Sequence, residues 1–171
     1  PKNTSDAFHA GIRVVHQEFN LLPYLSVAEN IYFERLPARN GFVNFKKLYQ
    51  ETEKILKRVG LDISPQTRVE NLGIAQMQLV EIAKALIYEN QVLIMDEPTA
   101  TLTTSEINTL FKIIHELKEQ GVTIIYISHR LQEIYEIGDR VTVLRNGEYV
   151  VTRNLSDLTI NDLVRYMVGK E

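Results

Sequence analysis

The 171-residue sequence predicts an α/β protein with a parallel sheet and an inserted helical subdomain. Two apolar runs, QVLIM at 91–95 and VTIIYIS at 122–128, are typical of buried strands, and the second is apolar enough to be covered on both faces. An amphipathic helical pattern at 103–121 joins them, so the three segments form a βαβ unit with parallel strands and a right-handed crossover. Residues 20–85, by contrast, carry helical and loop patterns only.

The chain before this unit begins with a short strand. GIRVVHQ at 11–17 is rich in β-branched residues. Pro23 then breaks the chain, and Ser26 with Glu29 predicts a capping box at the start of a short helix. The composition of residues 37–44 is typical of a loop.

Longer helices are predicted on both sides of the strand at 91–95. Residues 45–62 have an amphipathic pattern that ends at Gly60, and Thr103 with Glu106 predicts a second capping box. The helix predicted at 74–90 has a broad apolar face made of Met77, Leu79, Val80, Ile82, Ala83, Leu86 and Ile87.

The last third of the chain predicts smaller elements. A short helix is expected at 131–138 and a closing helix at 158–169. Between them, residues 139–152 predict a hairpin, because Asn146-Gly147 is a strong signal for a two-residue turn.

Composition excludes several classes of function. The net charge is −3 and no basic run is present, which argues against a nucleic-acid partner. The chain has no cysteine, so it has neither a disulfide framework nor a thiolate metal site, and its four histidines lack metal-ligand spacing. No apolar run reaches the roughly 18 to 20 residues that span a bilayer.

Polar residues follow three of the predicted strands. Asp96 and Glu97 end one strand, His129 ends the next, and Gln17 ends the first. Ligands of open parallel sheets gather at the carboxyl ends of the strands, so these residues are expected to converge. A helix cap or an ion pair is the ordinary role for any one of them alone. For the whole set, a phosphate-and-magnesium site explains the chemistry better.

Two adjacent carboxylates need a compensating partner, because like charges repel and a buried carboxylate is costly. A hard cation with oxygen ligands would compensate Asp96 and Glu97. One carboxylate would hold Mg²⁺, and the other would orient or deprotonate an attacking water. Separately, Gly73, Ile74, Ala75 and Gln76 begin a predicted helix, whose free N–H groups suit a phosphate. An ordinary glycine-containing helix start is the alternative.

At this point the chain resembles the nucleotide-binding subunit of ABC (ATP-binding cassette) transporters, and most closely those of bacterial monosaccharide importers of the ribose, xylose and galactose type. VVHQE resembles the Q-loop, LGIAQMQLVEIAKAL the signature motif with its helix, and VLIMDEP the Walker B motif. TATLT lies where the D-loop falls, YISHR resembles the switch region, and VTVLRNGE with MVG fits the end of a first cassette. The matches cover essentially the whole chain in the family's order.

The resemblance implies a partial P-loop NTPase (RecA-like) fold. Residues 1–19 and 86–171 would form the α/β hydrolase core, and residues 20–85 the helical signature subdomain. The implied function is ATP binding and hydrolysis that powers sugar import.

The resemblance also implies roles for the residues at the strand ends. Asp96 would hold Mg²⁺, Gln17 would touch Mg²⁺ and the water, and Glu97 would polarise that water. His129 would contact the γ-phosphate and hold Glu97 in place. The signature residues Gly73, Ile74, Ala75 and Gln76 would serve the ATP of an opposite cassette.

The implied partners are a second cassette bound head to tail, transmembrane permease subunits and, indirectly, a sugar-binding protein, with no nucleic acid. The implied location is the cytoplasmic face of the membrane, as a peripheral subunit. The segment FNLLPYLSVAENIYF at 19–33 is the predicted permease contact. The alternative is that its aromatic residues only pack the helical subdomain.

The sequence departs from the family pattern at several positions. Gly73 stands where serine is usual, Ala75 stands near the usual glycine, and Thr103 stands where many relatives have aspartate. The phosphate-binding pattern G-x-x-x-x-G-K-[ST] is absent. We therefore expect a fragment that lacks the phosphate-binding loop and is inactive on its own.

Two other functions remain open from the sequence. One is a non-transport ABC-type ATPase, such as a DNA-repair or translation factor, although the long coiled coil or charged linker usual in those relatives is absent here. The other is a non-catalytic docking module. Intact Asp96, Glu97 and His129 favour hydrolysis over docking.

Overall fold

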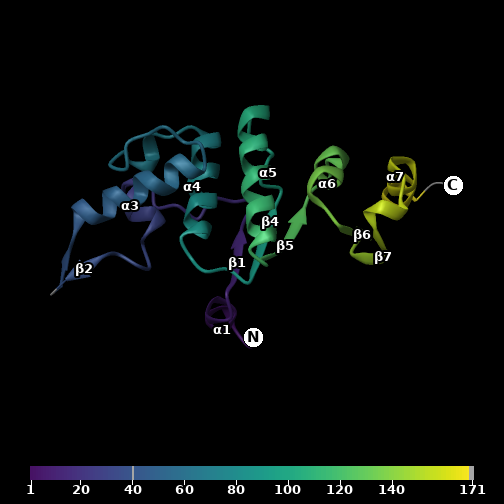
Figure 1. Ribbon diagram of the computed structural model, residues 1–171, viewed down its shortest axis with the longest axis horizontal. Helices are drawn as coiled ribbons and strands as arrows, with labels where there is room; N and C mark the ends of the chain where they lie inside the picture. The colour runs from purple at the N-terminus through teal and green to yellow at the C-terminus, as the bar shows by residue number, and fades with distance from the viewer. Residues whose placement is uncertain (40, 170–171) are drawn as a thin grey trace. The chain divides into compact units, whose positions relative to one another are not determined.

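The computed structural model describes residues 1–39 and 41–169 (Figure 1). The chain divides into two compact units, Pro1–Ile127 and Ser128–Glu171. The first contains the parallel sheet and the longer helices, and the second contains a hairpin and two short helices.

The sheet of the first unit has three parallel strands in the order β1-β4-β5. The strands are β1 (Ile12–Val15), β4 (Val92–Asp96) and β5 (Thr123–Ile127). Helix α5 (Thr104–Glu119) connects β4 to β5 and lies alongside them in Figure 1. The predicted α/β class and the predicted βαβ unit are confirmed.

One face of the sheet is packed and the other is open within the described chain. Leu93 and Met95 are fully buried, and the ring of Tyr126 contacts Phe111 of α5 edge to face. On the opposite face, Ile125 and Ile127 are each 46% exposed. The prediction that β5 is covered on both faces is therefore wrong for this chain, because the described helices cover one side of the strand.

The helices between β1 and β4 pack on one another. They are α2 (Val27–Ile31), α3 (Phe45–Arg58), the 3-10 turn η1 (Val69–Asn71) and α4 (Ile74–Leu86). The predicted capping box of Ser26 and Glu29 starts α2. Buried apolar residues between these helices form the local core: Val27, Ala28, Ile31, Leu48, Leu56, Val80 and Ala83.

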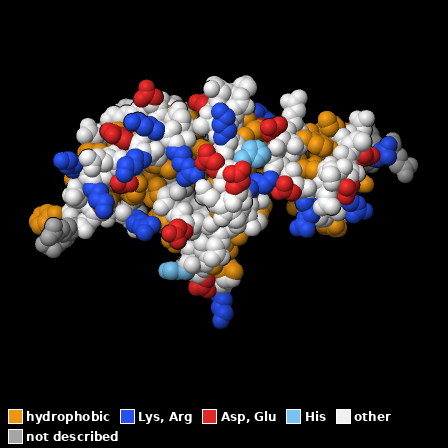
Figure 2. Space-filling view, in the orientation of Figure 1, with side chains coloured by type: hydrophobic (Ala, Val, Ile, Leu, Met, Phe, Trp, Pro, Cys, Tyr) orange, Lys and Arg blue, Asp and Glu red, His pale blue; other side chains and the backbone are white. Residues whose placement is uncertain are grey.

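Basic residues lie along the outer side of this helical region, as the blue side chains in Figure 2 show. Helix α3 contributes Lys46, Lys47, Lys54, Lys57 and Arg58. None of the helices in residues 1–39 and 41–169 combines the length and the apolar character that crossing a bilayer requires.

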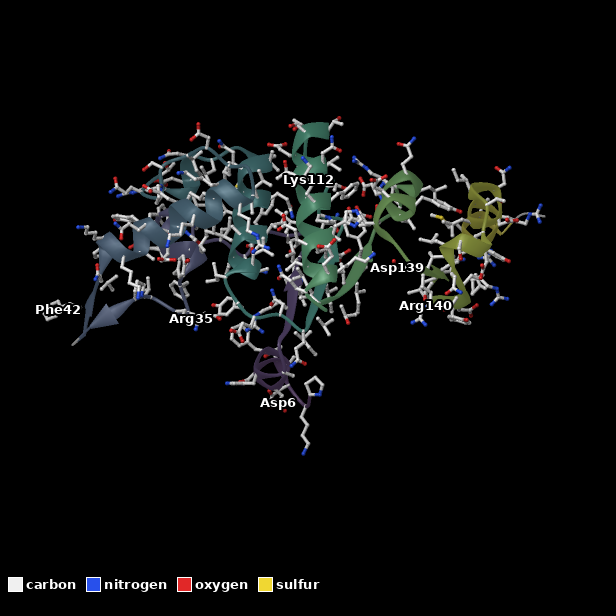
Figure 3. All side chains as sticks on the ribbon, in the orientation of Figure 1. Asp6, Arg35, Phe42, Lys112, Asp139 and Arg140 are labelled. Carbon is white, nitrogen blue, oxygen red and sulfur yellow. The ribbon has the colours of Figure 1, made fainter. Side chains whose placement is uncertain are left out.

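A short helix and a two-stranded ribbon were not predicted. Helix α1 (Thr4–His9) forms near the N-terminus because the Asn3 side chain accepts a hydrogen bond from the Asp6 N–H at 2.8 Å, as an N-cap does. Strands β2 (Ala38–Arg39) and β3 (Phe42–Val43) pair antiparallel where a loop was expected. Phe42 projects outward from this ribbon in Figure 3 and is 80% exposed.

The second unit confirms the predictions for the C-terminal third. Helix α6 (Leu131–Ile137) precedes the antiparallel strands β6 (Arg140–Arg145) and β7 (Glu148–Asn154). Asn146 and Gly147 have φ values of 53° and 79°, as a two-residue hairpin turn requires.

The closing elements of this unit are the 3-10 turn η2 (Leu155–Asp157) and helix α7 (Ile160–Val168). Helix α7 packs Leu163 against Val143 and Val151 of the hairpin. These three side chains are the buried centre of the second unit.

Candidate functional site

The carboxyl ends of the three parallel strands meet at one edge of the first unit. Val15 of β1 pairs with Met95 of β4, and Asp96 pairs with Ile127 of β5. Gln17 follows β1 by two residues, so its backbone leaves the sheet at the same edge as Asp96. The predicted convergence of Gln17 with Asp96 is therefore supported by the strand register. Asp96 is half-buried and Gln17 is exposed.

The residue after β4 has an unusual backbone. Glu97 has a φ of 45°, in the left-handed region that non-glycine residues rarely adopt. Its N–H donates to the Ile127 carbonyl at 2.9 Å, and its own carbonyl accepts from the Ala100 N–H at 3.2 Å. Backbone strain of this kind clusters at functional sites, where the surrounding structure maintains it. Glu97 thus leaves the end of β4 in a fixed, strained turn that β5 supports.

The turn ends at a well-formed helix cap. The Thr103 N–H and hydroxyl each donate to the Glu106 carboxylate at 2.7 Å, and the Glu106 N–H returns a bond to Thr103 at 3.4 Å. The predicted capping box is confirmed. Threonine in place of the usual aspartate therefore still caps α5, since both side chains supply an oxygen acceptor.

The signature residues form the start of α4. Gly73 is the N-cap with φ −73° and ψ 162°, and its N–H donates to the Gln76 side-chain oxygen at 3.0 Å. A Cβ added to Gly73 would lie 3.9 Å from that oxygen, which is ordinary contact. Neither the backbone angles nor the available space requires glycine at position 73. A serine would fit the same turn, so glycine in its place removes a hydroxyl without changing the shape of the turn.

The first turn of α4 presents backbone donors. The N–H groups of Ile74, Ala75 and Gln76 have no carbonyl within the helix to bond, because they precede its first i→i−4 bond. They carry part of the positive end of the helix dipole. These residues are part of a helix start, whereas Gln17, Asp96 and Glu97 belong to the sheet edge.

His129 lies in the second unit, two residues after the end of β5, and is exposed. The residues on both sides of His129 donate hydrogen bonds to the Glu133 carboxylate. The Ser128 hydroxyl donates at 3.1 Å, and the Arg130 guanidinium donates at 3.2 Å. The Arg130 N–H also donates to the Ser128 hydroxyl at 3.0 Å. Glu133 is 6% exposed, so a buried acceptor fixes the turn that carries His129.

Sequence reasoning missed Glu133. The available signal was an acidic residue in the first turn of a helix, four positions after a candidate histidine. That pattern alone is common, because acidic residues favour the first helical turn through the helix dipole. Its burial and the hydrogen bonds from Ser128 and Arg130 distinguish Glu133 from an ordinary first-turn glutamate.

Polar residues at the carboxyl edge of a parallel sheet define an α/β protein of the class that binds ligands at its strand ends. The family model described as ABC transporter matches residues 1–100, and the chain belongs to this family. The predicted family resemblance is thereby confirmed.

Individual relatives agree with the family. A ribose/galactose/methyl galactoside import ATP-binding protein of Burkholderia ambifaria is 53% identical over 98% of this chain and 32% of its own length. The galactose/methyl galactoside import ATP-binding protein MglA of Clostridium perfringens is 45% identical over 99% of this chain and 33% of its own length. The chain thus spans about a third of the length of these relatives.

Solved structures show the same fold. A nucleotide-free ATP-binding cassette from an ABC transporter superposes with a TM-score of 0.73 at 26% identity. The match covers 95% of this chain and 68% of that cassette. The predicted cassette fold is confirmed by this match.

Proposed function

We propose that the chain supplies the Walker B, switch and signature parts of an ABC-type ATPase that powers sugar import. The observation that carries the proposal is the strained, supported turn that places Glu97 directly after Asp96 at the sheet edge. The names of the relatives, which are import ATP-binding proteins for ribose and galactose, support the substrate class.

The predicted domain division fits this proposal. Helices α2, α3 and α4 pack on one another between β1 and β4, which supports a helical subdomain at 20–85. The proposed α/β core would then comprise residues 1–19 and 86–171, a division that differs from the two compact units, which separate after Ile127.

The oxygen donors at the sheet edge fit Mg²⁺. Mg²⁺ at phosphate sites is held by one or two carboxylates together with water and phosphate oxygens. Asp96 is half-buried at the end of β4, and the backbone at Gln17 leaves the sheet at the same edge. Asp96 and Gln17 would hold the ion, which neutralises charge on the phosphates of ATP.

Glu97 is the proposed base of hydrolysis. Its backbone is anchored on β5, and its carboxylate would orient the attacking water and accept a proton from it. His129 would contact the γ-phosphate and orient Glu97. Gly73, Ile74, Ala75 and Gln76 would offer backbone donors to the ATP of the second cassette.

The proposed partners are a second cassette bound head to tail, a transmembrane permease and, through it, a sugar-binding protein. The protein would lie at the cytoplasmic face of the membrane. The permease contact is proposed at residues 19–33, where Leu22 is 44%, Tyr24 is 76% and Phe33 is 53% exposed. Exposed aromatic and aliphatic side chains of this kind are typical of interface centres.

The test of the proposal is Glu97→Gln in the complete protein that carries these residues. We expect ATP binding to persist while steady-state phosphate release falls by about 10² to 10⁴-fold, because a carboxamide cannot accept the proton. Glu89→Gln is the matched control, since Glu89 is an exposed glutamate shortly before β4.

Two outcomes would contradict the proposal. If the turnover of Glu97→Gln stays within about threefold of wild type, roughly 0.65 kcal/mol of barrier, Glu97 is not the base. If the unmodified complete protein releases no phosphate, the chain serves as a docking module rather than as an ATPase.

A further inference from the structure

The segment after Gln17 is fastened to the middle of α4. The backbone N–H of Asn20 donates to the Glu81 carboxylate at 2.6 Å. The backbone carbonyl of the same residue accepts from the Lys84 ammonium at 3.2 Å. Glu81 and Lys84 are three residues apart on α4 and therefore lie on the same side of the helix. One side of α4 thus binds both polar backbone groups of Asn20.

The contact to Glu81 is buried. Glu81 is 7% exposed, and a carboxylate at that depth is costly unless it accepts hydrogen bonds. A hydrogen bond to an ionised acceptor is shorter and stronger than one between neutral groups. The bond between Asn20 and Glu81 is therefore a fixed part of the fold.

A second buried side chain extends the attachment. Asn30 of α2 is 2% exposed, and its side chain accepts from the Leu22 N–H at 2.7 Å and donates to the Leu22 carbonyl at 3.0 Å. The backbone from Asn20 to Leu22 is thus held on α4 at one end and on α2 at the other.

This attachment limits the position of Gln17. Gln17 precedes Asn20 by three residues, which span at most about 10 to 11 Å when fully extended. Its other end is fixed at Val15, which is buried in β1. Glu81 lies seven residues beyond the first residue of α4, roughly 10 Å along the helix axis. A movement of α4 that keeps these bonds therefore moves Asn20, and Gln17 lies on the short segment between Asn20 and the fixed Val15.

We propose that Glu81 and Lys84 are positioning residues that couple Gln17 to the signature helix. The inference rests on the proposed function, in which Gln17 contacts Mg²⁺ and the start of α4 serves the opposite ATP. Through the bonds of Glu81 and Lys84 to Asn20, a shift of α4 toward a second cassette would change the position of the glutamine at its own sheet edge. Glu81 is the stronger half, because it is buried whereas Lys84 is partly exposed.

The first test is hydrogen exchange in the complete protein without nucleotide. Glu81→Ala removes the acceptor, and amide exchange in the peptide covering 17–22 should accelerate on the order of tenfold, since a hydrogen bond to a charged group is lost. Glu81→Gln keeps a side-chain oxygen acceptor and should stay close to wild type.

The matched control is Thr52→Val. Thr52 is fully buried in α3 and its hydroxyl bonds only the local Leu48 carbonyl, at 2.8 Å. This variant removes a buried hydrogen bond from the helical region without touching Asn20, so exchange at 17–22 should not accelerate selectively. Equal acceleration in Glu81→Ala and Thr52→Val would overturn the proposal, because the effect would then be general loosening.

The second test is the Mg²⁺ dependence of phosphate release. Glu81→Ala should raise the Mg²⁺ concentration for half-maximal rate by about threefold or more, and Glu81→Gln should restore it. In a Gln17→Ala background, Glu81→Ala should add no further shift, because it acts through Gln17. An additional shift of the same size in that background would overturn the coupling.

The two proposals fail in different ways. If Gln17→Ala leaves the Mg²⁺ dependence unchanged, the proposed role of Gln17 fails and the coupling fails with it. If Gln17→Ala shifts the Mg²⁺ dependence while Glu81→Ala does not, only the coupling fails and the proposed function stands.

Discussion

Gln17 and His129 occupy equivalent places in the chain but are held by different means. Each follows the last residue of a parallel strand by two positions. The segment after Gln17 is fixed by Glu81 and Lys84, which lie 61 and 64 residues from Asn20. The turn at His129 is fixed by Glu133, at separations of five residues from Ser128 and three from Arg130.

The difference separates a turn that near neighbours hold from a segment whose position depends on a distant helix. Contacts between near neighbours close a short loop at low entropic cost and persist whatever distant elements do. Contacts across 61 residues exist only while α4 packs in its place. We therefore expect the turn at His129 to keep its local geometry, and Gln17 to respond to the position of α4.

The largest effect is expected at the histidine itself. His129→Ala in the complete protein should lower steady-state phosphate release by about 10²-fold or more, because the proposed contact to the γ-phosphate and the orientation of Glu97 are lost. His16→Ala is the control: His16 is also exposed at a strand end, but it precedes Gln17 and should point to the other face. Equal losses of phosphate release in the two variants would show that His129 has no role that His16 lacks.

An intermediate effect is expected at Glu133. Glu133→Ala leaves the Ser128 hydroxyl and the Arg130 guanidinium without their acceptor and should reduce the free energy of unfolding by about 1 to 3 kcal/mol. Hydrogen exchange should accelerate at 128–133 and not at 17–22. Glu136→Ala, an exposed neighbour on α6, should change stability by less than about 0.5 kcal/mol. Faster hydrogen exchange at both 128–133 and 17–22 would show that Glu133 does not act on its own turn alone.

The smallest effect concerns β1, the strand that precedes Gln17. The Arg13 guanidinium of β1 lies 3.2 Å from the Phe8 ring centroid and 4.6 Å from that of Tyr88, whose hydroxyl donates to Glu34 at 3.3 Å. Burial raises the pKa of Tyr88 above 10.0. The unfolded chain therefore releases the phenol proton first, so this contribution to stability is present below about pH 10 and is lost as pH rises through the folded pKa.

The measurement is the free energy of unfolding between about pH 9 and 11. Tyr88→Phe has no proton to release and should flatten part of the alkaline decline. Tyr24→Phe is the control, because Tyr24 is 76% exposed. An unchanged alkaline decline in Tyr88→Phe would show that this long-range cluster does not couple to folding.

Much of the fold could be predicted from local spacing. Ser26 with Glu29 and Thr103 with Glu106 form the predicted capping boxes, and Asn146-Gly147 forms the predicted turn. Such interactions join residues within four positions, so the spacing of residue types along the chain is sufficient to specify them. Asp96 and Glu97 could be predicted as site candidates for the same reason, because they directly follow an apolar run in the sequence.

Other features could not be predicted because they depend on packing. The sequence shows that VTIIYIS is apolar, but whether each face of β5 is covered depends on what lies beside it, and the described chain leaves Ile125 and Ile127 exposed. The left-handed backbone of Glu97 is also maintained by a bond to Ile127, 30 residues away along the chain.

The sequence by itself determined the α/β order, the helix starts, the hairpin and the residue types at the strand ends. Only the tertiary structure decided which distant groups form hydrogen bonds to the segments that follow the strand ends. Glu81 read in sequence is one polar residue on a helix, and nothing in its neighbours identifies Asn20 as its partner. A buried carboxylate must find a donor, but which donor it finds is fixed only when α4 packs against the chain that leaves β1.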